Sequence, residues 1–237
     1  VILALDADFL SCAPGSVRYT HDFAARRRVS AGKHEMNRLY AVESSPSLTG
    51  AAADHRLPLR PSEIAPFAYT VAAELGVSGI TRPAAIGSAP AQWIKAVVKD
   101  LQQHKGTSLV LAGEQQPPIV HALAHAMNHA LGNVGTTVRY TDPVEAHAVD
   151  HLQSLRELDD DMAGGHVKLL VIIGGNPVYA APVDLRFAEH LDQLGLRVHL
   201  SLYHDETSAP CHWHIPETHF LESWSDTRAY DGTVSIV

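Results

Sequence analysis

Residues 167–173 show the clearest strand pattern in the chain. They read VKLLVII, with one charged side chain among seven positions, and a short run this apolar is typical of a strand buried on both faces of a parallel sheet. Gly174 and Gly175 follow, and they allow a sharp turn and a close approach of the backbone to a ligand. Asn176 offers hydrogen-bond donors and an acceptor, and Pro177 suits the first position of a helix. In an open α/β sheet, such a loop lies where ligands bind, although a plain tight turn explains it equally well.

Apolar spacing predicts alternating strands and helices along the rest of the chain. Short apolar runs predict further strands at residues 3–5, 39–42, 108–112 and 197–202. Helical spacing predicts helices at residues 16–28, 62–75, 91–104, 117–131 and 183–194. A less distinct helix at 143–158 is expected to end in a solvated, mobile exit that contains Asp159, Asp160, Asp161, Gly164 and Gly165. This alternation indicates an α/β fold with mostly parallel sheets flanked by helices.

Two parts of the chain repeat one another. A polar strand tip occurs at residues 6–8 (DAD) and again at 174–176 (GGN), and each is followed by a second strand and a proline-containing segment. Four aligned positions in those segments lie 158 residues apart: Thr49 with Thr207, Ala51 with Ala209, Leu57 with Ile215, and Pro58 with Pro216. We therefore expect two Rossmann-like lobes related by an approximate internal repeat, with both sets of tips lining one crevice.

The same pattern suggests three parts. A first half-lobe is expected at residues 1–78, and a linker with a central strand and helices at 79–166. The linker opens with the Pro-, Gly- and Ser-rich residues 79–90. A second half-lobe is expected at 167–237, continuing in a longer parent chain, because a strand pattern is already under way at Val1 and another begins near Val234.

Composition narrows the possible partners. The chain has 26 acidic and 18 basic side chains, and its formal charge of -8 argues against nucleic acid as a partner. The single basic run, Arg26 to Arg28, is best interpreted as the solvated end of a helix. Two cysteines cannot ligate an iron–sulfur cluster alone, and no run of about 18 apolar residues predicts a membrane span.

Two groups of residues could hold a metal ion. His121, His125 and His129 are spaced to share one helix face, but the glutamate of metalloprotease motifs is missing, so we interpret them as a polar stripe. The second group has better ligand types, but an extended segment would turn its cysteine away from two of its histidines. It comprises Cys211, His212, His214 and His219. A zinc module built from it is a distant alternative.

The sequence also leaves open whether the chain contains a catalytic triad and whether Asp205 binds a nucleotide. No G-x-S-x-G elbow supports a Ser/His/Asp triad, although serines and histidines are plentiful. Asp205 follows a strand, so its carboxylate could bind ribose hydroxyls or the amino edge of a base. A simple role in capping a turn is the favoured interpretation of Asp205.

Several motifs resemble the dimethyl sulfoxide reductase family of molybdopterin oxidoreductases. IIGGNPVYAAP at 172–182 resembles its G-x-NP loop, and residues 207–216 resemble its T-A-x-x-A-D-x-x-L-P segment. TGAAADHRLPLRP at 49–61 is similar to the counterpart of that segment in the family's other central domain, and LGNVG at 131–135 to its L-x-GN-x-G turn. The resemblance implies a domain of an oxidoreductase that binds molybdopterin guanine dinucleotide.

One branch of that family is a closer match. Residues 36–64 and 219–237 resemble the molybdopterin-oxidoreductase-like part of the large iron–sulfur subunit of alternative complex III, a bacterial quinol-oxidising membrane assembly. The resemblance implies a periplasmic location on the inner membrane, partner subunits of that complex, iron–sulfur clusters elsewhere in the parent chain, and no molybdenum cofactor.

Departures from the cofactor-binding relatives support the same expectation. Cys211-His212 stands where those relatives have Ala-Asp, and Ser62-Glu63 stands where they have Gly-Thr-Asp. Trp213 and the neighbouring imidazoles are expected to crowd a pterin. We therefore expect a structural and interaction scaffold without its own cofactor, metal or catalytic residues. The alternative is an enzyme domain that binds molybdopterin guanine dinucleotide through Gly174, Gly175, Asn176, Pro177, Asp205 and Thr207.

Overall fold

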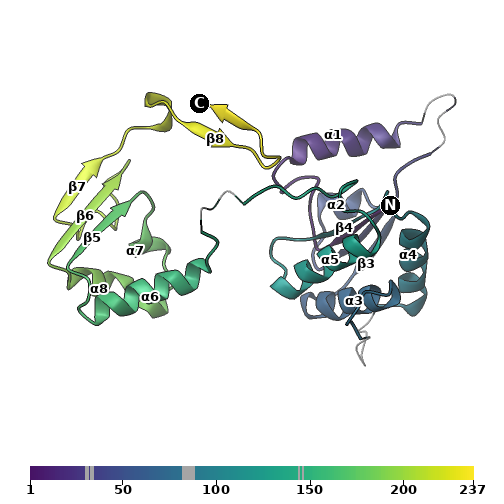
Figure 1. Ribbon diagram of the computed structural model, residues 1–237, viewed down its shortest axis with the longest axis horizontal. Coiled ribbons are helices and arrows are strands. Elements are labelled where there is room, and N and C mark those ends of the chain that lie inside the picture. Colours follow the sequence, from purple (N-terminus) through teal and green to yellow (C-terminus); the bar gives the residue numbers. More distant parts are fainter. Residues whose placement is uncertain (30–31, 33–34, 82–88, 144, 146) are drawn as a thin grey trace. The chain divides into compact units, whose positions relative to one another are not determined.

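The computed structural model describes residues 1–29, 32, 35–81, 89–143, 145 and 147–237. The chain forms two compact units, Val1–Tyr140 and Thr141–Val237 (Figure 1). The observed division therefore falls at Tyr140, whereas boundaries at 78 and 166 were expected. Residues 82–88 of the expected linker lie outside the described part of the chain.

The first unit contains a four-stranded parallel sheet. Its strands are β1 (Ile2–Leu5), β2 (Leu39–Glu43), β3 (His55–Pro58) and β4 (Leu109–Ala112), in the order β3-β2-β1-β4. The helices are α1 (Ser16–Arg27), α2 (Leu48–Ala51), α3 (Pro61–Glu74), α4 (Ala91–Gln103) and α5 (Pro118–Ala130). These elements confirm the strands and helices predicted for this part, and pairing of β4 with β1 joins residues 109–112 to the first lobe.

Helices cover the two faces of this sheet unequally. The main core lies between one face and helices α3, α4 and α5, where Leu3, Leu5, Phe67 and Leu101 are fully buried (Figure 1). The opposite face packs on α1 through a smaller cluster that contains Phe23. Most of the apolar burial in this unit is therefore on the α3–α5 side.

An asparagine side chain protects the outer edge of β4. Asn128 Oδ1 accepts a hydrogen bond from Val110 N at 3.0 Å, and its Nδ2 donates to Val110 O at 2.8 Å. The amide thus occupies both backbone groups of Val110, which face the edge where a further strand would pair.

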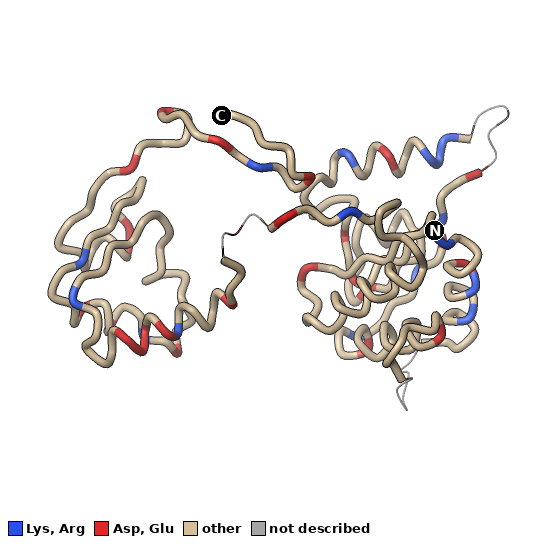
Figure 2. Tube along the Cα trace, viewed as in Figure 1, with Lys and Arg blue, Asp and Glu red and all other residues tan. Residues whose placement is uncertain are grey.

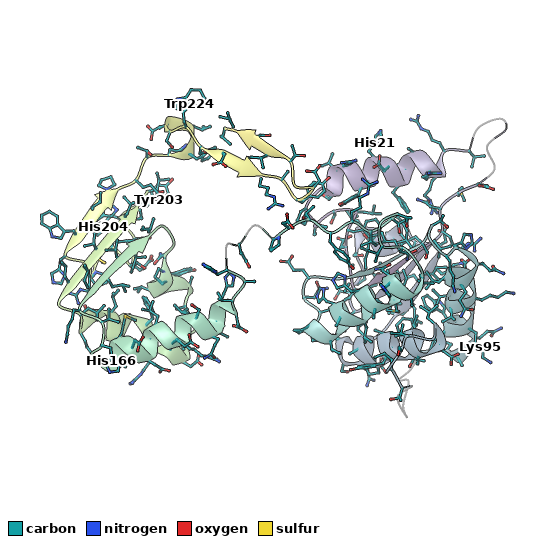
Figure 3. The ribbon with its side chains drawn as sticks, viewed as in Figure 1. His21, Lys95, His166, Tyr203, His204 and Trp224 are labelled. Carbon is teal, nitrogen blue, oxygen red and sulfur yellow. The ribbon has the colours of Figure 1, made fainter. Side chains whose placement is uncertain are left out.

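The second unit contains a three-stranded parallel sheet in the order β5-β6-β7. Its strands are β5 (Leu169–Ile173), β6 (Leu196–Ser201) and β7 (Trp213–Pro216), and its helices are α6 (His151–Ala163), α7 (Pro177–Ala180), η1 (Val183–Leu185) and α8 (Phe187–Asp192). The chain ends in η2 (Phe220–Glu222) and an antiparallel hairpin of β8 (Asp226–Arg228) and β9 (Val234–Ile236). Trp224, just before β8, is 90% exposed (Figure 3).

Two helix predictions in this unit are wrong. The helix expected at 143–158 is α6, which runs from 151 to 163, and residues 144 and 146 are outside the described set. The acidic triplet is inside this helix and not in a solvated exit, and Asp159 is buried and bonds His190 Nδ1 at 2.9 Å. The helix expected at 183–194 is interrupted at Arg186, whose φ of 52° is left-handed.

Burial of β5 on both faces is also contradicted. Its side chains alternate between half-buried and exposed, and Val171 and Ile173 are 50% and 73% exposed. Helices α6 and α8 cover the face that carries Leu170 and Ile172. The apolar composition therefore identified the strand but not its surroundings.

The two sheets confirm the fold class and the internal repeat. β1 pairs with β2 in the register Ile2 to Leu39, and β5 pairs with β6 in the equivalent register, Leu170 to Arg197. β2–β3 and β6–β7 also pair in equivalent registers. The chain is thus an α/β protein with two Rossmann-like lobes. No helix in the described ranges is both long and apolar enough to cross a bilayer.

Gly50 provides a test of packing in the first unit. A Cβ at this position would overlap the carboxylate of Glu43, which is buried and paired with Arg56. We expect Gly50→Ala to destabilise the chain by about 1–3 kcal/mol, because a methyl group cannot enter without shifting this pair. Gly195→Ala is the control, since its Cβ would approach an atom only to 3.6 Å, and it should change stability by less than about 0.5 kcal/mol. Urea denaturation measures both, and equal midpoints would contradict the prediction.

Candidate functional site

The predicted GGNP loop lies at the carboxyl end of β5. Gly174 and Gly175 have φ angles of 63° and 68°, in the left-handed region that favours glycine. A Cβ on either residue would meet no atom within 4 Å, so the backbone conformation, and not a close contact, accounts for both glycines. Asn176 caps α7, which the sequence analysis did not predict, and Pro177 is its first residue, as expected.

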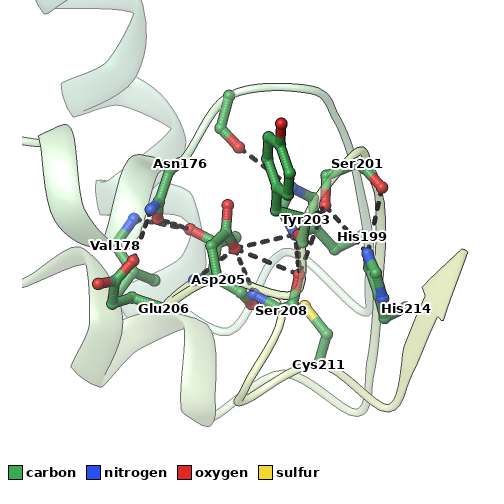
Figure 4. Close-up of polar contacts among 12 residues, drawn as sticks. Asn176, Val178, His199, Ser201, Tyr203, Asp205, Glu206, Ser208, Cys211 and His214 are labelled. Carbon is green, nitrogen blue, oxygen red and sulfur yellow. Dashed lines mark hydrogen bonds and ion pairs between the residues drawn. The ribbon is translucent and has the colours of Figure 1, made fainter. Parts of the chain in front are cut away.

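A threonine hydroxyl joins this loop to the loop after β6. Thr207 Oγ1 donates to Asn176 Oδ1 at 2.7 Å and accepts from Val178 N at 3.0 Å (Figure 4). Asn176 Nδ2 in turn donates to Glu206 Oε2 at 2.7 Å. The structure therefore brings Asn176 and Thr207 together, and both side chains form hydrogen bonds within the protein.

Asp205 caps the turn that presents Thr207. Its Oδ1 accepts hydrogen bonds from Thr207 N at 3.1 Å and from Ser208 N at 3.0 Å. Desolvation raises the pKa of Asp205, but hydrogen bonds from Ser208, the nearby His199 and the Thr207 amide together hold it below its usual range. The geometry matches the turn-capping interpretation of Asp205.

The pKa of Glu206 is also lowered, chiefly by the hydrogen bond from Asn176. This carboxylate is on the exposed side of the same loop. Tyr203 and His204 precede it at the carboxyl end of β6, and the His204 ring packs edge-to-face on His214 with centroids 5.3 Å apart (Figure 3). The exposed part of the loop is therefore acidic and aromatic.

A buried histidine that the sequence analysis missed holds the same loop from below. His199 is 0% exposed, its Nε2 donates to Gly175 O at 3.1 Å, and its Nδ1 bonds Ser208 Oγ at 2.8 Å. His199 Nδ1 is also 3.5 Å from Asp205 Oδ1. Ser208 is only 2% exposed, so this Ser/His/Asp grouping has no room for a substrate and serves to fix the loop. A histidine within an apolar strand was the sequence signal for it.

The first unit contains the same threonine bridge. Thr49 Oγ1 donates to Asp8 Oδ1 at 2.7 Å and accepts from Leu10 N at 3.2 Å. Asp6 has a φ of 54°, equivalent to the 63° of Gly174, and its side chain accepts from Ser44 N at 2.8 Å. The repeat therefore extends to individual hydrogen bonds.

A cavity of about 630 Å³ lies at the strand tips of this first unit. The residues that line it include Asp6, Asp8, Glu43 and Glu114, and none of the described lining residues is Lys or Arg, although Glu43 pairs with Arg56 outside the lining. Desolvation raises the pKa of Asp8, but hydrogen bonds from Ser11, Thr49 and Cys12 outweigh this effect. The net pKa is therefore below its usual value, which favours the ionised form. A cavity lined in this way repels phosphate groups.

Neither candidate metal group forms a cluster of ligands in the described part of the chain. No cluster of three or more potential ligands occurs among the residues that the structure describes. In the second group, Cys211 Sγ donates to Thr207 O, His212 Nδ1 accepts from Arg197 N, and His219 Nδ1 accepts from Leu221 N. Burial raises the pKa of the Cys211 thiol.

The expected crowding by Trp213 and the imidazoles is corrected. Trp213 is 65% exposed on one face of the second sheet, whereas His214 is on the opposite face and bonds Ser201 Oγ at 3.1 Å. The residues cannot act as one block, because adjacent positions of a strand point to opposite faces.

The groups at these strand tips fit a dinucleotide poorly. A pyrophosphate binds best to free N–H donors and basic side chains, but the side-chain donors of Asn176 and Thr207 are bonded to the protein, and the exposed Glu206 beside them is acidic. No protein-family model and no curated protein matches this chain.

Removing the bridging hydroxyl should destabilise the second unit. Thr207→Val leaves the Val178 amide and the Asn176 oxygen short of a partner, which we expect to cost about 1–3 kcal/mol. Thr207→Ser keeps the hydroxyl and is the matched control. Urea denaturation and hydrogen exchange at Val178 measure the effect, and a valine variant as stable as the serine variant would show that the bridge is dispensable.

Acid should expose the role of Asp205. Its pKa is lower in the folded state, so its ionised form adds stability above the unfolded pKa of about 3.9, and this contribution is lost as pH falls through the folded pKa. The free energy of unfolding of Asp205→Asn should therefore fall less than that of the unsubstituted chain when the pH is lowered from about 7 to about 3. Urea midpoints at both pH values test this, and equal losses would refute it.

Proposed function

We propose that this chain is a molybdopterin-oxidoreductase-like scaffold domain in a bacterial quinol-oxidising electron-transfer complex, without a cofactor of its own. One observation carries the proposal: in both units, the threonine at the strand tips is bonded to the preceding loop and not left free for a ligand. A hydroxyl that donates one bond and accepts another has little remaining capacity.

The charge at the strand tips supports the same role. The cavity in the first unit is lined by four acidic residues, of which only Glu43 is paired with a basic side chain that the structure describes, and Glu206 is exposed beside the bridge in the second. Cofactors with two phosphate groups bind where positive charge or helix N-termini face them. The proposed partners are other subunits of the complex, at the periplasmic face of the inner membrane, and quinol oxidation would belong to the assembly.

Cofactor content tests the proposal directly. The full-length parent protein, purified in its assembly, should contain less than about 0.1 molybdenum atom and 0.1 guanine nucleotide per chain. Elemental analysis and nucleotide release after denaturation measure these values. A content near one per chain would refute the scaffold role and favour the alternative, an active domain that binds molybdopterin guanine dinucleotide.

A further inference from the structure

One face of the sheet in the second unit is entirely apolar. The strand registers place eight side chains on it: Leu169, Val171, Ile173, Leu196, Val198, Leu200, Trp213 and Ile215. Six of the eight are exposed, and Ile173 reaches 73%. Parallel sheets are normally covered on both faces, and a large apolar patch marks a binding surface.

The opposite face of the same strands shows the normal arrangement. Leu170 and Ile172 alternate with the exposed residues of β5, and they pack against Met162 and Leu191 of α6 and α8. The two faces of one strand therefore differ in cover and not in composition.

The internal repeat indicates what covers the exposed apolar face of this sheet, which we call the open face. The equivalent registers relate Leu3 and Leu5 of β1 to Val171 and Ile173 of β5. In the first unit, Leu3 and Leu5 are fully buried against the layer of helices formed by α3, α4 and α5. The layer presents uncharged side chains at helical spacing, such as Ile64, Phe67 and Val71 of α3.

In the second unit, β7 is followed by η2 and the β8–β9 hairpin, and among the described residues no α-helix follows it. The open face is therefore the one on which the repeat places a helical layer.

Charge further defines the occupant. Residues 141–237 contain 16 acidic and five basic side chains (Figure 2). Glu206 and Glu217 follow β6 and β7 at the carboxyl end of the sheet, and both are exposed. This charge opposes binding to an anionic lipid surface and favours a partner with basic residues around an apolar centre.

We propose that a partner subunit docks a layer of amphipathic helices on this face. The helices bury an uncharged stripe on Val171, Leu200 and Ile215, and their Lys and Arg side chains lie beside Glu206 and Glu217. The inference rests on the proposed scaffold function, because it names the surface through which the scaffold binds its partner.

Photo-cross-linking in the intact parent assembly tests this surface. The photoreactive residue p-benzoylphenylalanine replaces Val171 in one variant and Leu170 in the other, so the probe is on opposite faces of the same strand. The Val171 probe should cross-link to a partner subunit, at peptides whose apolar residues recur at three- and four-residue spacing. The Leu170 probe should cross-link only within the chain, to α6 or α8.

Other products of the Val171 probe would overturn the inference. These are cross-links to any other segment of the parent chain outside the second unit, to residues 217–237, to a second copy or to lipid, and the absence of any cross-link. Molybdenum and nucleotide content, measured on the same preparation, separates the two proposals. A cofactor-loaded assembly with partner cross-links would refute the scaffold role alone, whereas a cofactor-free assembly without them would refute the surface alone.

A charge on the open face provides a second measurement. Val171→Asp should lower recovery of the cross-linked subunit with the parent protein at least tenfold, and it should leave the urea midpoint of the isolated chain nearly unchanged. Leu170→Asp buries a charge under α6 and α8, so it should lower that midpoint. Undiminished recovery with Val171→Asp would refute the proposed docking surface.

Discussion

The hydrogen-bond bridge between neighbouring strand ends is the constraint on which both units depend. In each unit, one threonine hydroxyl fixes the loop after the first strand by binding both its backbone and a side-chain oxygen. The bridge joins positions that are 29 to 41 residues apart, so it orders two loops at once. The strand ends, where such folds usually bind ligands, are thereby organised around internal bonds.

The two units share the backbone geometry of the repeat but have different side chains at equivalent positions. Glu43 pairs with Arg56 in the first unit, and the equivalent positions in the second are Ser201 and His214, which form a hydrogen bond. The amide that opens β2 bonds Asp54, and the one near the start of β6 bonds His212. Equivalent positions of the two units make similar hydrogen bonds with different side chains. The two halves of the sequence therefore share few identical residues.

The sequence predicted strands β1, β2, β4, β5 and β6, most helices and the repeat, because these depend on local spacing and on glycine and proline geometry. It did not predict β3 and β7 as strands, since each is four residues long and ends in proline. It did not predict that one face of β5 is exposed, since the apolar composition of a strand does not show which element packs on each face. The bounds of α6 were also missed, because the acidic triplet was interpreted as solvated, whereas Asp159 is buried against a histidine 31 residues away. At the candidate site, Asn176 and Thr207 were found by motif, whereas the role of His199 required knowledge of what the strand packs against.

The outer strands of the two sheets differ in how they are protected. Asn128 occupies the edge of β4, but β5 ends its sheet beside an uncovered apolar face. An unguarded edge next to an apolar surface is where newly made chains aggregate. The second unit thus carries the greater aggregation hazard during biosynthesis, and early assembly on this face would remove it.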